Sequence, residues 1–179
     1  MHSCSYLSEK CFVKASTKNN IGVFAREIIL KGELICAWGG IVFTETEILK
    51  KAKQYPKLIT HPIAIYDNLF LIPINANKLE DADRFNHSCN PNAGIKGQIL
   101  LISRKKIMPN EEICFDYETA AIGRSDGLPF KCKCQSKKCR KKITGKAWKS
   151  PSFRRKNKGF LSWYIERKIE KFLNKNSKA

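Results

Sequence analysis

The stretch that decides the fold is Arg84–Asn92, with the sequence RFNHSCNPN. It places asparagine, histidine, serine and cysteine side chains in one polar turn, directly before an apolar strand. The amides and backbone groups of such a turn can read a polar small molecule, so the stretch is a candidate ligand site. A histidine such as His87, taken alone, is more often a hydrogen-bonding structural residue than a catalyst.

A second stretch follows about twenty residues downstream. Pro109-Asn110 predicts a turn, which leads into an apolar strand over residues 112–117. This strand ends in Phe115, Asp116 and Tyr117. A Phe-Asp-Tyr triplet by itself occurs by chance, so its weight depends on the motifs around it.

The third stretch is a cysteine cluster. Cys132, Cys134 and Cys139 follow the pattern C-x-C-x4-C. Thiolate sulfur is a soft ligand, and Zn²⁺ held by four thiolates at ~2.3 Å is a common structural site. No Cys or His follows Cys139 in the sequence, so the fourth ligand must come from elsewhere in the fold.

Five other cysteines are candidates for that fourth ligand. Cys89 is favoured because it lies in the polar turn, where a thiolate can face outward. Cys36 and Cys114 lie in apolar, strand-like runs and are typical of core residues, while Cys4 and Cys11 also stay open. The alternative interpretation is three surface thiols without a metal.

The length and composition of the chain limit the class of protein to which it can belong. The chain has 179 residues and a mass of 20.5 kDa, which suits one globular domain of ~100–200 residues with a small appendage. Hydrophobic residues make up 42% and charged residues 28%, which excludes wholesale disorder. No apolar stretch approaches the ~18–20 residues that span a bilayer, and the N-terminus lacks a secretory signal. We therefore expect no membrane span, a cytoplasmic location and reduced, metal-binding thiols.

The charge is concentrated at one end of the chain. Lys and Arg exceed Asp and Glu by 18 overall, yet residues 1–130 carry a net charge of only +2. Residues 131–179 contain 18 basic and 2 acidic side chains, a net charge of +16. Such a field attracts polyanions, including nucleic acid, ribosomes and acidic protein surfaces. The plainer interpretation is a solubilising tail.

Short apolar runs separated by turns predict a mostly β fold. Strand-like runs lie at residues 21–25, 33–43, 63–74, 98–103 and 112–117, bounded by Gly, Pro or Asn. A helix is expected over residues 44–55, because Thr44 can cap it with Glu47 and Pro56 can end it. We expect few helices and much pairing between strands that are distant in sequence.

The C-terminal part has a different organisation. Residues 119–131 have the composition of a linker. After the cysteine cluster, apolar residues recur at helical spacing at Leu161, Ile165, Ile169 and Phe172, which predicts an amphipathic helix over residues 159–174. Such a stripe most often docks on the core, and a helix that binds a partner or a membrane surface is the alternative.

Taken together, these motifs closely resemble those of SET-domain protein lysine methyltransferases that carry a post-SET zinc segment. The matching pieces are Asn86–Asn92, Asn110–Tyr117 and Cys132–Arg140, in the family's order. Residues 18–25 resemble the family's first cofactor motif. The resemblance spans roughly residues 10–145. It implies a SET fold of short strands with a pseudoknot that brings residues 84–92 against residues 112–117.

The resemblance implies two bound groups. S-adenosylmethionine would lie between the first cofactor motif and the polar turn, with Phe130 as part of its wall. The implied cofactor-binding residues are Asn20, Ile21, Gly22, Arg84, Phe85, Asn86, His87 and Phe130. One Zn²⁺ would be held by Cys89, Cys132, Cys134 and Cys139.

The resemblance also implies transfer of a methyl group to a protein lysine. Tyr117 would be the catalytic tyrosine, and Phe115 would occupy the position that sets the space around the amine. A Phe there leaves room for a methylated amine, so di- or trimethylation is expected. The lysine ammonium, with an ordinary pKa of ~10.4, must lose its proton in a poorly solvated channel. Positioning and oriented dipoles then supply the catalysis, with no side-chain nucleophile.

Three positions depart from the family pattern or extend it. Asn20 stands where the family commonly has a glycine, which implies a less tight cofactor loop. The family's Tyr-x-Gly motif is Trp38-Gly39-Gly40 here, and Trp38 is a candidate for the channel wall. Tyr66 is a candidate for a second channel aromatic.

The expected organisation is a SET catalytic domain (residues 1–118), a post-SET zinc segment (119–145) and a basic C-terminal extension with an amphipathic helix (146–179). The expected partner is a histone or other protein that presents a lysine, and the basic extension could contact nucleic acid or chromatin. A bacterial nucleoid or a host nucleus is the alternative location. The competing hypothesis is a zinc-stapled nucleic-acid-binding or scaffold protein with the SET shape and no turnover.

Overall fold

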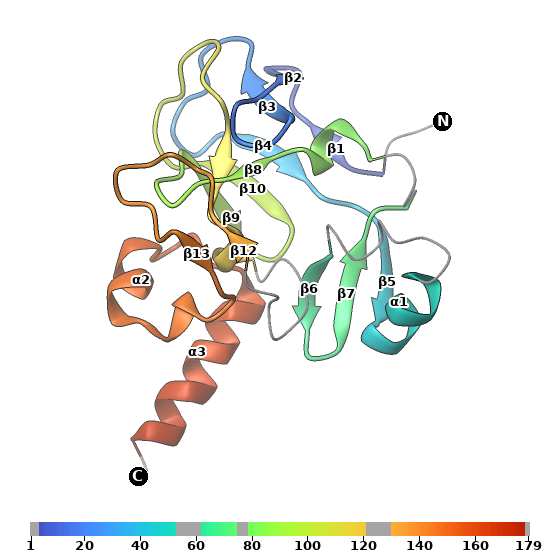
Figure 1. The fold of residues 1–179 in the computed structure, drawn as a ribbon, viewed down its shortest axis with the longest axis vertical. Coiled ribbons are helices and arrows are strands. Elements are labelled where there is room, and N and C mark those ends of the chain that lie inside the picture. Colours follow the sequence, from blue (N-terminus) through green and yellow to red (C-terminus); the bar gives the residue numbers. More distant parts are fainter. Residues whose placement is uncertain (1–3, 53–61, 75–78, 121–129, 178–179) are drawn as a thin grey trace.

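Short antiparallel strands make up most of the regular structure. The computed structural model describes residues 4–52, 62–74, 79–120 and 130–177, and Figure 1 shows their arrangement. The strands are β1 (Tyr6–Leu7), β2 (Cys11–Ala15), β3 (Ile21–Ala25), β4 (Leu34–Ala37), β5 (Ile41–Thr44), β6 (Ile63–Tyr66), β7 (Leu69–Ile72), β8 (Asn86–His87), β9 (Ala93–Lys96), β10 (Leu100–Ser103), β11 (Cys114–Phe115), β12 (Phe130–Lys131) and β13 (Lys142–Ile143). The predicted mostly β fold is confirmed.

The core lies under the sheet with strand order β1-β4-β10-β9, in which every pairing is antiparallel. Ile35, Cys36, Ile95 and Leu101 from its strands are fully buried. Each of these side chains removes apolar surface from water, which is the main stabilising term in folding. Cys36 therefore acts as a core residue, as predicted, and so does the buried Cys114.

A second sheet, with strand order β5-β7-β6, forms a separate lobe with helix α1 (Glu45–Ala52). Phe70 and Ile72 of this sheet pack with Ile48 of α1 in one buried cluster. The predicted cap is present, since the Thr44 amide donates to Glu47 (2.7 Å) and the Glu47 amide donates to the Thr44 hydroxyl (3.3 Å). The predicted end of this helix lies outside the described residues.

The two motif stretches meet in a parallel strand pair. β8 pairs with β11, so that Asn86 lies opposite Cys114 and His87 opposite Phe115. The expected contact between residues 84–92 and 112–117 is therefore confirmed. The strand predicted over residues 112–117 is shorter than expected, because Asp116 accepts a hydrogen bond from the Glu118 amide and starts a turn of 3-10 helix.

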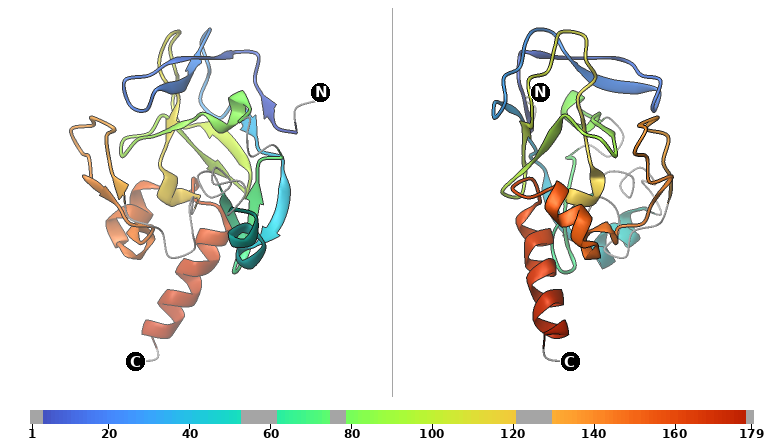
Figure 2. Two further views of the ribbon diagram at one scale, coloured as in Figure 1. Left: turned by 45° about the vertical axis from the view of Figure 1, so that its right-hand side comes forward. Right: turned by 90° about the vertical axis from the view of Figure 1, so that its left-hand side faces the viewer.

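The C-terminal part folds into two helices instead of the one predicted. The first, α2 (Pro151–Lys156), has proline at its first position, and the second, α3 (Trp163–Asn176), is capped by Ser162. Ile165, with Trp148 and Phe153, forms a buried cluster, so the first half of α3 docks on the protein. Phe172 still packs on Trp148, with ring centroids 5.7 Å apart, and Figures 1 and 2 show the C-terminal end of α3 projecting from the body. Among the described helices, none has the length and apolarity to cross a bilayer.

Candidate active site and metal centre

The amide of Asn86 ties three distant segments together. Its side-chain nitrogen donates to the Ile21 carbonyl (3.0 Å) and to Oε1 of Glu112 (2.8 Å). Glu112 also pairs with the Lys18 ammonium and accepts a hydrogen bond from the Ser16 hydroxyl (2.7 Å). Asn86 is buried, and polar groups inside a protein are stable only when they are bonded in this way. The turn before β3, β8 and the segment before β11 are thereby fixed relative to one another.

Gly22 and Asn20 shape the turn at this junction. A Cβ atom at Gly22 would lie 2.5 Å from Oε1 of Glu112 and 2.8 Å from the Asn86 amide nitrogen, so any other residue would displace these two bonded side chains. Asn20 has a φ of 44°, in the left-handed region that asparagine tolerates better than most residues. The departure from glycine at Asn20 is therefore compatible with a tight turn.

Tyr117 occupies the centre of the site. Its hydroxyl donates to the Phe85 carbonyl (2.7 Å), and its backbone amide donates to Nδ1 of His87 (3.2 Å). Burial raises the pKa of Tyr117 well above that of a free phenol, so the hydroxyl keeps its proton. Its ring packs against Phe115, with centroids 5.1 Å apart.

Two cavities meet at Tyr117. The first, of about 240 Å³, lies between the turn before β3 and the segment that starts at β12. Its lining residues are Lys18, Asn19, Asn86, His87, Tyr117, Phe130, Lys131, Lys133 and Cys134. It combines aromatic rings, amides and ammonium groups, which fits an amphiphilic molecule with a planar base and charged ends.

The second cavity, of about 260 Å³, shares Asn19 and Tyr117 with the first. Its walls are mainly apolar and aromatic. The lining residues are Asn19, Trp38, Gly39, Ile63, Leu71, Ile72, Pro73, Ala82, Asp83, Phe85, Phe115 and Tyr117. A narrow hydrocarbon chain with a polar end suits such a cavity.

Asp83 is the one carboxylate among the described residues that line the second cavity. One of its oxygens accepts a hydrogen bond from the Glu80 amide (2.9 Å). Burial raises the pKa of Asp83 to about 6. A carboxylate beside an apolar cavity favours a cationic occupant. Sequence reasoning missed this residue, because an Asp in a polar stretch carries no signal of its own.

The remaining residues expected at the site are placed differently. Phe85 and Phe115 line the second cavity. Asn20, Ile21 and Gly22 form the turn behind the first cavity, while Arg84 donates to the Leu79 carbonyl (3.2 Å). Neither Arg84 nor the turn residues Asn20, Ile21 and Gly22 are among the described residues that line a cavity at Tyr117.

Tyr66 does not join the site around Tyr117. It is 46% exposed and stacks on Trp163, with ring centroids 6.1 Å apart. The register of β6 shifts between Ala64 and Tyr66, so the Tyr66 side chain does not follow the buried Ala64 and lies against Trp163 of α3 instead. Trp38, in contrast, lines the second cavity and packs against Phe115 at 5.4 Å.

Cys89, Cys132 and Cys134 converge with His87, their ligand atoms all within 4.8 Å of one another, and Cys139 packs against this group. The Sγ atoms of Cys89 and Cys132 are 3.8 Å apart, close to the ~3.8 Å between sulfurs that follows from tetrahedral Zn–S bonds of ~2.3 Å. Cys134 and Cys139 pack in the same cluster. Backbone amides donate to Sγ of Cys89 from Arg140 (3.4 Å) and to Sγ of Cys134 from Cys89 (3.5 Å). The donor set therefore fits zinc.

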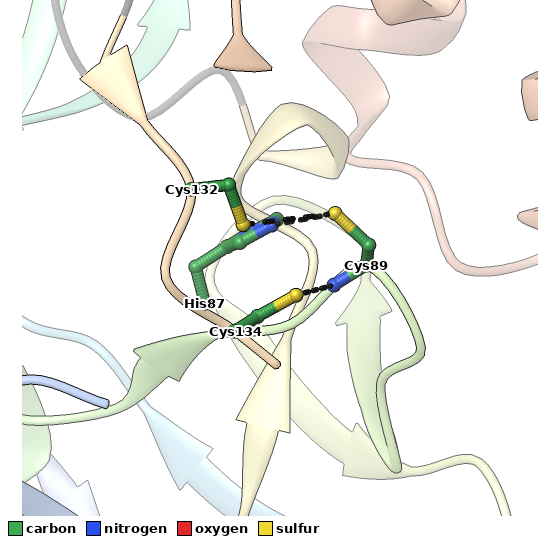
Figure 3. A group of neighbouring side chains, drawn as sticks. All are labelled: His87, Cys89, Cys132 and Cys134. Carbon is green, nitrogen blue, oxygen red and sulfur yellow. Dashed lines mark hydrogen bonds between the residues drawn. The ribbon is translucent and has the colours of Figure 1, made fainter. Parts of the chain in front are cut away.

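His87 also touches this cluster, as Figure 3 shows, with its Nε2 3.3 Å from Sγ of Cys89. Its Nδ1 accepts from the Tyr117 amide, so in the neutral ring the proton resides on Nε2. Nε2 then donates to the sulfur and has no lone pair for a metal. This geometry favours Cys139 as the fourth ligand and makes His87 a link between the metal centre and Tyr117.

Arg140 locks the cysteine segment to the end of β11. Its guanidinium bonds both oxygens of Asp116 at 2.6 Å and Glu118 at 2.8 Å. The side chains of Asp116 and Glu118 are 0% and 2% exposed. Sequence analysis noted Arg140 only as the end of a motif and missed this role, because its partners are 22 and 24 residues away.

Comparisons with known proteins agree with this geometry. Residues 20–118 match the SET domain family. Histone-lysine N-methyltransferase ash1 of Drosophila melanogaster is 29% identical over 134 residues, which cover 70% of this chain and 6% of that protein. Probable histone-lysine N-methyltransferase set-23 of Caenorhabditis elegans is 28% identical over 144 residues, or 73% of this chain and 58% of that protein.

Solved structures show the same fold. The methyltransferase domain of human histone-lysine N-methyltransferase SETMAR superimposes with a TM-score of 0.57 and 22% identity, over 75% of this chain and 58% of that chain. The chain spans 58% or less of the length of each of these relatives. The SET match covers more than half of the chain and includes both strands of the β8–β11 pair. The chain therefore belongs to the SET-domain family.

Proposed function

We propose that this protein is an S-adenosylmethionine-dependent protein lysine N-methyltransferase. The observation that carries the proposal is the meeting of two cavities at Tyr117, one amphiphilic and one apolar. A cofactor in the first cavity and a lysine side chain in the second would approach each other from opposite sides. The relatives named histone-lysine N-methyltransferases support this assignment.

The protein's part in the reaction is positioning. Bound S-adenosylmethionine would supply an electrophilic methyl group on a sulfonium. Asn86 and Gly22 fix the turn beside the first cavity, and the Tyr117 hydroxyl, held by the Phe85 carbonyl, lies at the junction. Asp83 would attract the lysine ammonium into the second cavity, and the apolar and aromatic walls that make up most of its lining would lower the pKa of the amine so that it can lose its proton. Preorganised dipoles at such a junction act without reorganisation.

We propose that the product is di- or trimethyllysine. Phe115 lines the second cavity and packs on Tyr117, and it has no hydroxyl to occupy the space beside the amine. Mass spectra of a true substrate should show two or three added methyl groups. Monomethyllysine as the sole product would contradict the assignment.

The proposal extends to the bound groups and partners. Zn²⁺ on Cys89, Cys132, Cys134 and Cys139 would hold the post-SET segment (119–145) over the catalytic domain (1–118). The protein substrate is a histone or another protein with an accessible lysine. The basic extension (146–179) would contact nucleic acid around that substrate, in a cytoplasmic or nuclear setting.

Transfer of radiolabelled methyl groups to lysine tests the proposal. Tyr117→Phe removes the hydroxyl at the junction and should lower the rate ~10²–10³-fold, the usual effect of one preorganised donor. Tyr6→Phe is the matched control, because Tyr6 is 50% exposed and lies on β1. Asn86→Ala should weaken cofactor binding, with the exposed Asn174→Ala as its control. Full activity in both site variants, with fold retained, would refute the residue assignments.

The competing hypothesis of a scaffold without turnover has a direct test. It predicts no binding of S-adenosylmethionine in a calorimetric titration. Tight binding, lost in Asn86→Ala, would favour the enzyme. The two cavities at Tyr117 favour the enzyme, since a scaffold has no need for either.

A further inference from the structure

A groove of about 410 Å³ lies between the cysteine segment and α2, which run side by side in Figures 1 and 2. Basic and hydroxyl side chains dominate it. The lining residues are Cys89, Glu118, Lys138, Arg140, Lys142, Thr144, Lys146, Ala147, Ser150, Ser152, Phe153 and Lys156. None of them lines either cavity at Tyr117. The groove is therefore separate from the site proposed for methyl transfer.

The positive charge of this groove is not neutralised from within. Its carboxylate, Glu118, is 2% exposed and already bonds Arg140 and three backbone amides. Lys138, Lys142 and Lys146 are exposed, and none has a carboxylate partner within ion-pair distance among the described residues. Uncompensated ammonium groups in a concave surface concentrate anions.

The positive charge continues beyond the groove walls. Exposed basic residues adjacent in sequence to the lining residues are Lys137, Lys141, Lys149 and Arg155. Residues 131–179 as a whole carry a net charge of +16. A single small anion would need only the groove. Charge that extends on both sides of it suits a polymer with regularly spaced phosphates.

The apolar side chains at the groove indicate which kind of polymer it binds. Phe153, the aromatic residue of the groove lining, is buried, and the 43% exposed Phe130 of the neighbouring strand β12 lines the first cavity at Tyr117 instead. The described groove lining therefore offers no exposed aromatic ring to stack on an unpaired base, as single-strand binders require. No exposed apolar side chain there can anchor in a bilayer either. Lysines without stacking platforms read the phosphate backbone of a duplex.

We propose that this lysine groove binds the phosphate backbone of duplex DNA without regard to sequence. The inference names the place of the nucleic-acid contact proposed above, and it holds whether or not methyl transfer occurs. DNA in the groove leaves both cavities at Tyr117 open. A lysine on a DNA-associated protein could then enter the second cavity while the enzyme stays on the duplex.

Fluorescence anisotropy with a short duplex of random sequence, titrated at several salt concentrations, tests the proposal. The zinc-loaded full chain should bind with an affinity that falls steeply with salt. Lys138→Gln, Lys142→Gln and Lys146→Gln combined should weaken binding at least ~10-fold and lower the salt slope by ~2.7, or ~0.9 for each lost phosphate contact. Lys156 is left unchanged because its ammonium bonds the carbonyl of Cys89, a proposed metal ligand.

A matched control removes the same charge elsewhere. Lys31, Lys50 and Lys106 are exposed and lie outside the lysine groove. The triple glutamine variant at these positions should bind DNA within about twofold of the wild type. Equal loss in the two triple variants would overturn the proposal, because net charge alone would then account for binding.

Three further measurements separate duplex binding at the groove from misfolding and from binding of a different polymer. Zinc content and melting temperature establish that each variant is folded, and the single variants Lys142→Gln and Lys146→Gln should each lower the salt slope by ~0.9. Single-stranded RNA that binds more tightly than the duplex would overturn the choice of polymer. Methylation of a free peptide should be unchanged in the groove variant, so this test fails or succeeds independently of the proposed activity.

Discussion

Replacing Arg140 with methionine should destabilise the protein more than any surface substitution nearby. The change keeps most of the side-chain volume and removes three charged hydrogen bonds of 2.6–2.8 Å. It leaves the carboxylates of Asp116 and Glu118 buried without their cation. Breaking a buried ion pair from one side usually costs ~3–5 kcal/mol, because the remaining charge is uncompensated.

The structure places the cost near the lower end of that range. Glu118 would keep three bonds from the backbone amides of Thr144, Lys146 and Ala147. Asp116 would keep only the Glu118 amide at 3.2 Å. We therefore expect a loss of ~3 kcal/mol, mostly from Asp116. At ~2–4 °C per kcal/mol for a chain of this size, the melting temperature should fall by ~6–12 °C.

Urea denaturation of the zinc-loaded protein at neutral pH measures this loss. Arg155→Met is the control, since Arg155 is exposed, and it should stay within ~0.5 kcal/mol of the wild type. Adding Asp116→Asn to the Arg140→Met variant removes the orphaned charge and should recover at least ~1 kcal/mol. A loss below ~1 kcal/mol for Arg140→Met, or no recovery in the double variant, would refute the reasoning.

Three other predictions follow from the site. Cys139→Ser should reduce zinc content measured by mass spectrometry far more than His87→Ala; the reverse order would make His87 the ligand. Gly22→Ala should cost ~1–3 kcal/mol by overpacking against Glu112 and weaken cofactor binding in calorimetry; an unchanged melting temperature would contradict this. Asp83→Asn should stabilise the protein by ~1 kcal/mol at pH 8 but not at pH 4. The pKa of Asp83, about 6 in the folded protein, exceeds its value in the unfolded chain. Protonation of Asp83 therefore stabilises the fold at low pH, and this stabilisation is lost as the pH rises through 6. Equal effects of the substitution at both pH values would exclude this cause.

Local sequence patterns predicted the structural features that depend on residues adjacent in the sequence. Thr44 and Glu47 formed the expected cap, and the buried Cys36 and Cys114 lay in apolar runs. The helix predicted from residue 159 begins at Trp163, because Ser162 is the better cap. In each case, hydrophobic periodicity and capping chemistry act within a few residues, where the sequence can be read directly.

Those local signals could not predict contacts between residues that are far apart in the sequence. The β8–β11 pair joins two-residue strands that are too short to show a pattern. Its prediction came from family resemblance, as did the roles of Asn86 and Tyr117. The carboxylates that bond Arg140 and the exposure of Tyr66 toward Trp163 depend on how distant elements pack. Asp83 is defined by a cavity whose walls come from six separate stretches of chain.

The pairing of β8 with β11 constrains when the site at Tyr117 can form during synthesis of the chain. β8 stays without its partner until residues 114–115 have left the ribosome. Arg140, which holds the cysteine segment to the end of β11, is translated later still, after all four proposed metal ligands. Because domains fold as units once their sequence is available, the pocket at Tyr117 can close only after Arg140 has been translated and, with the proposed ligand set, only once zinc is at hand.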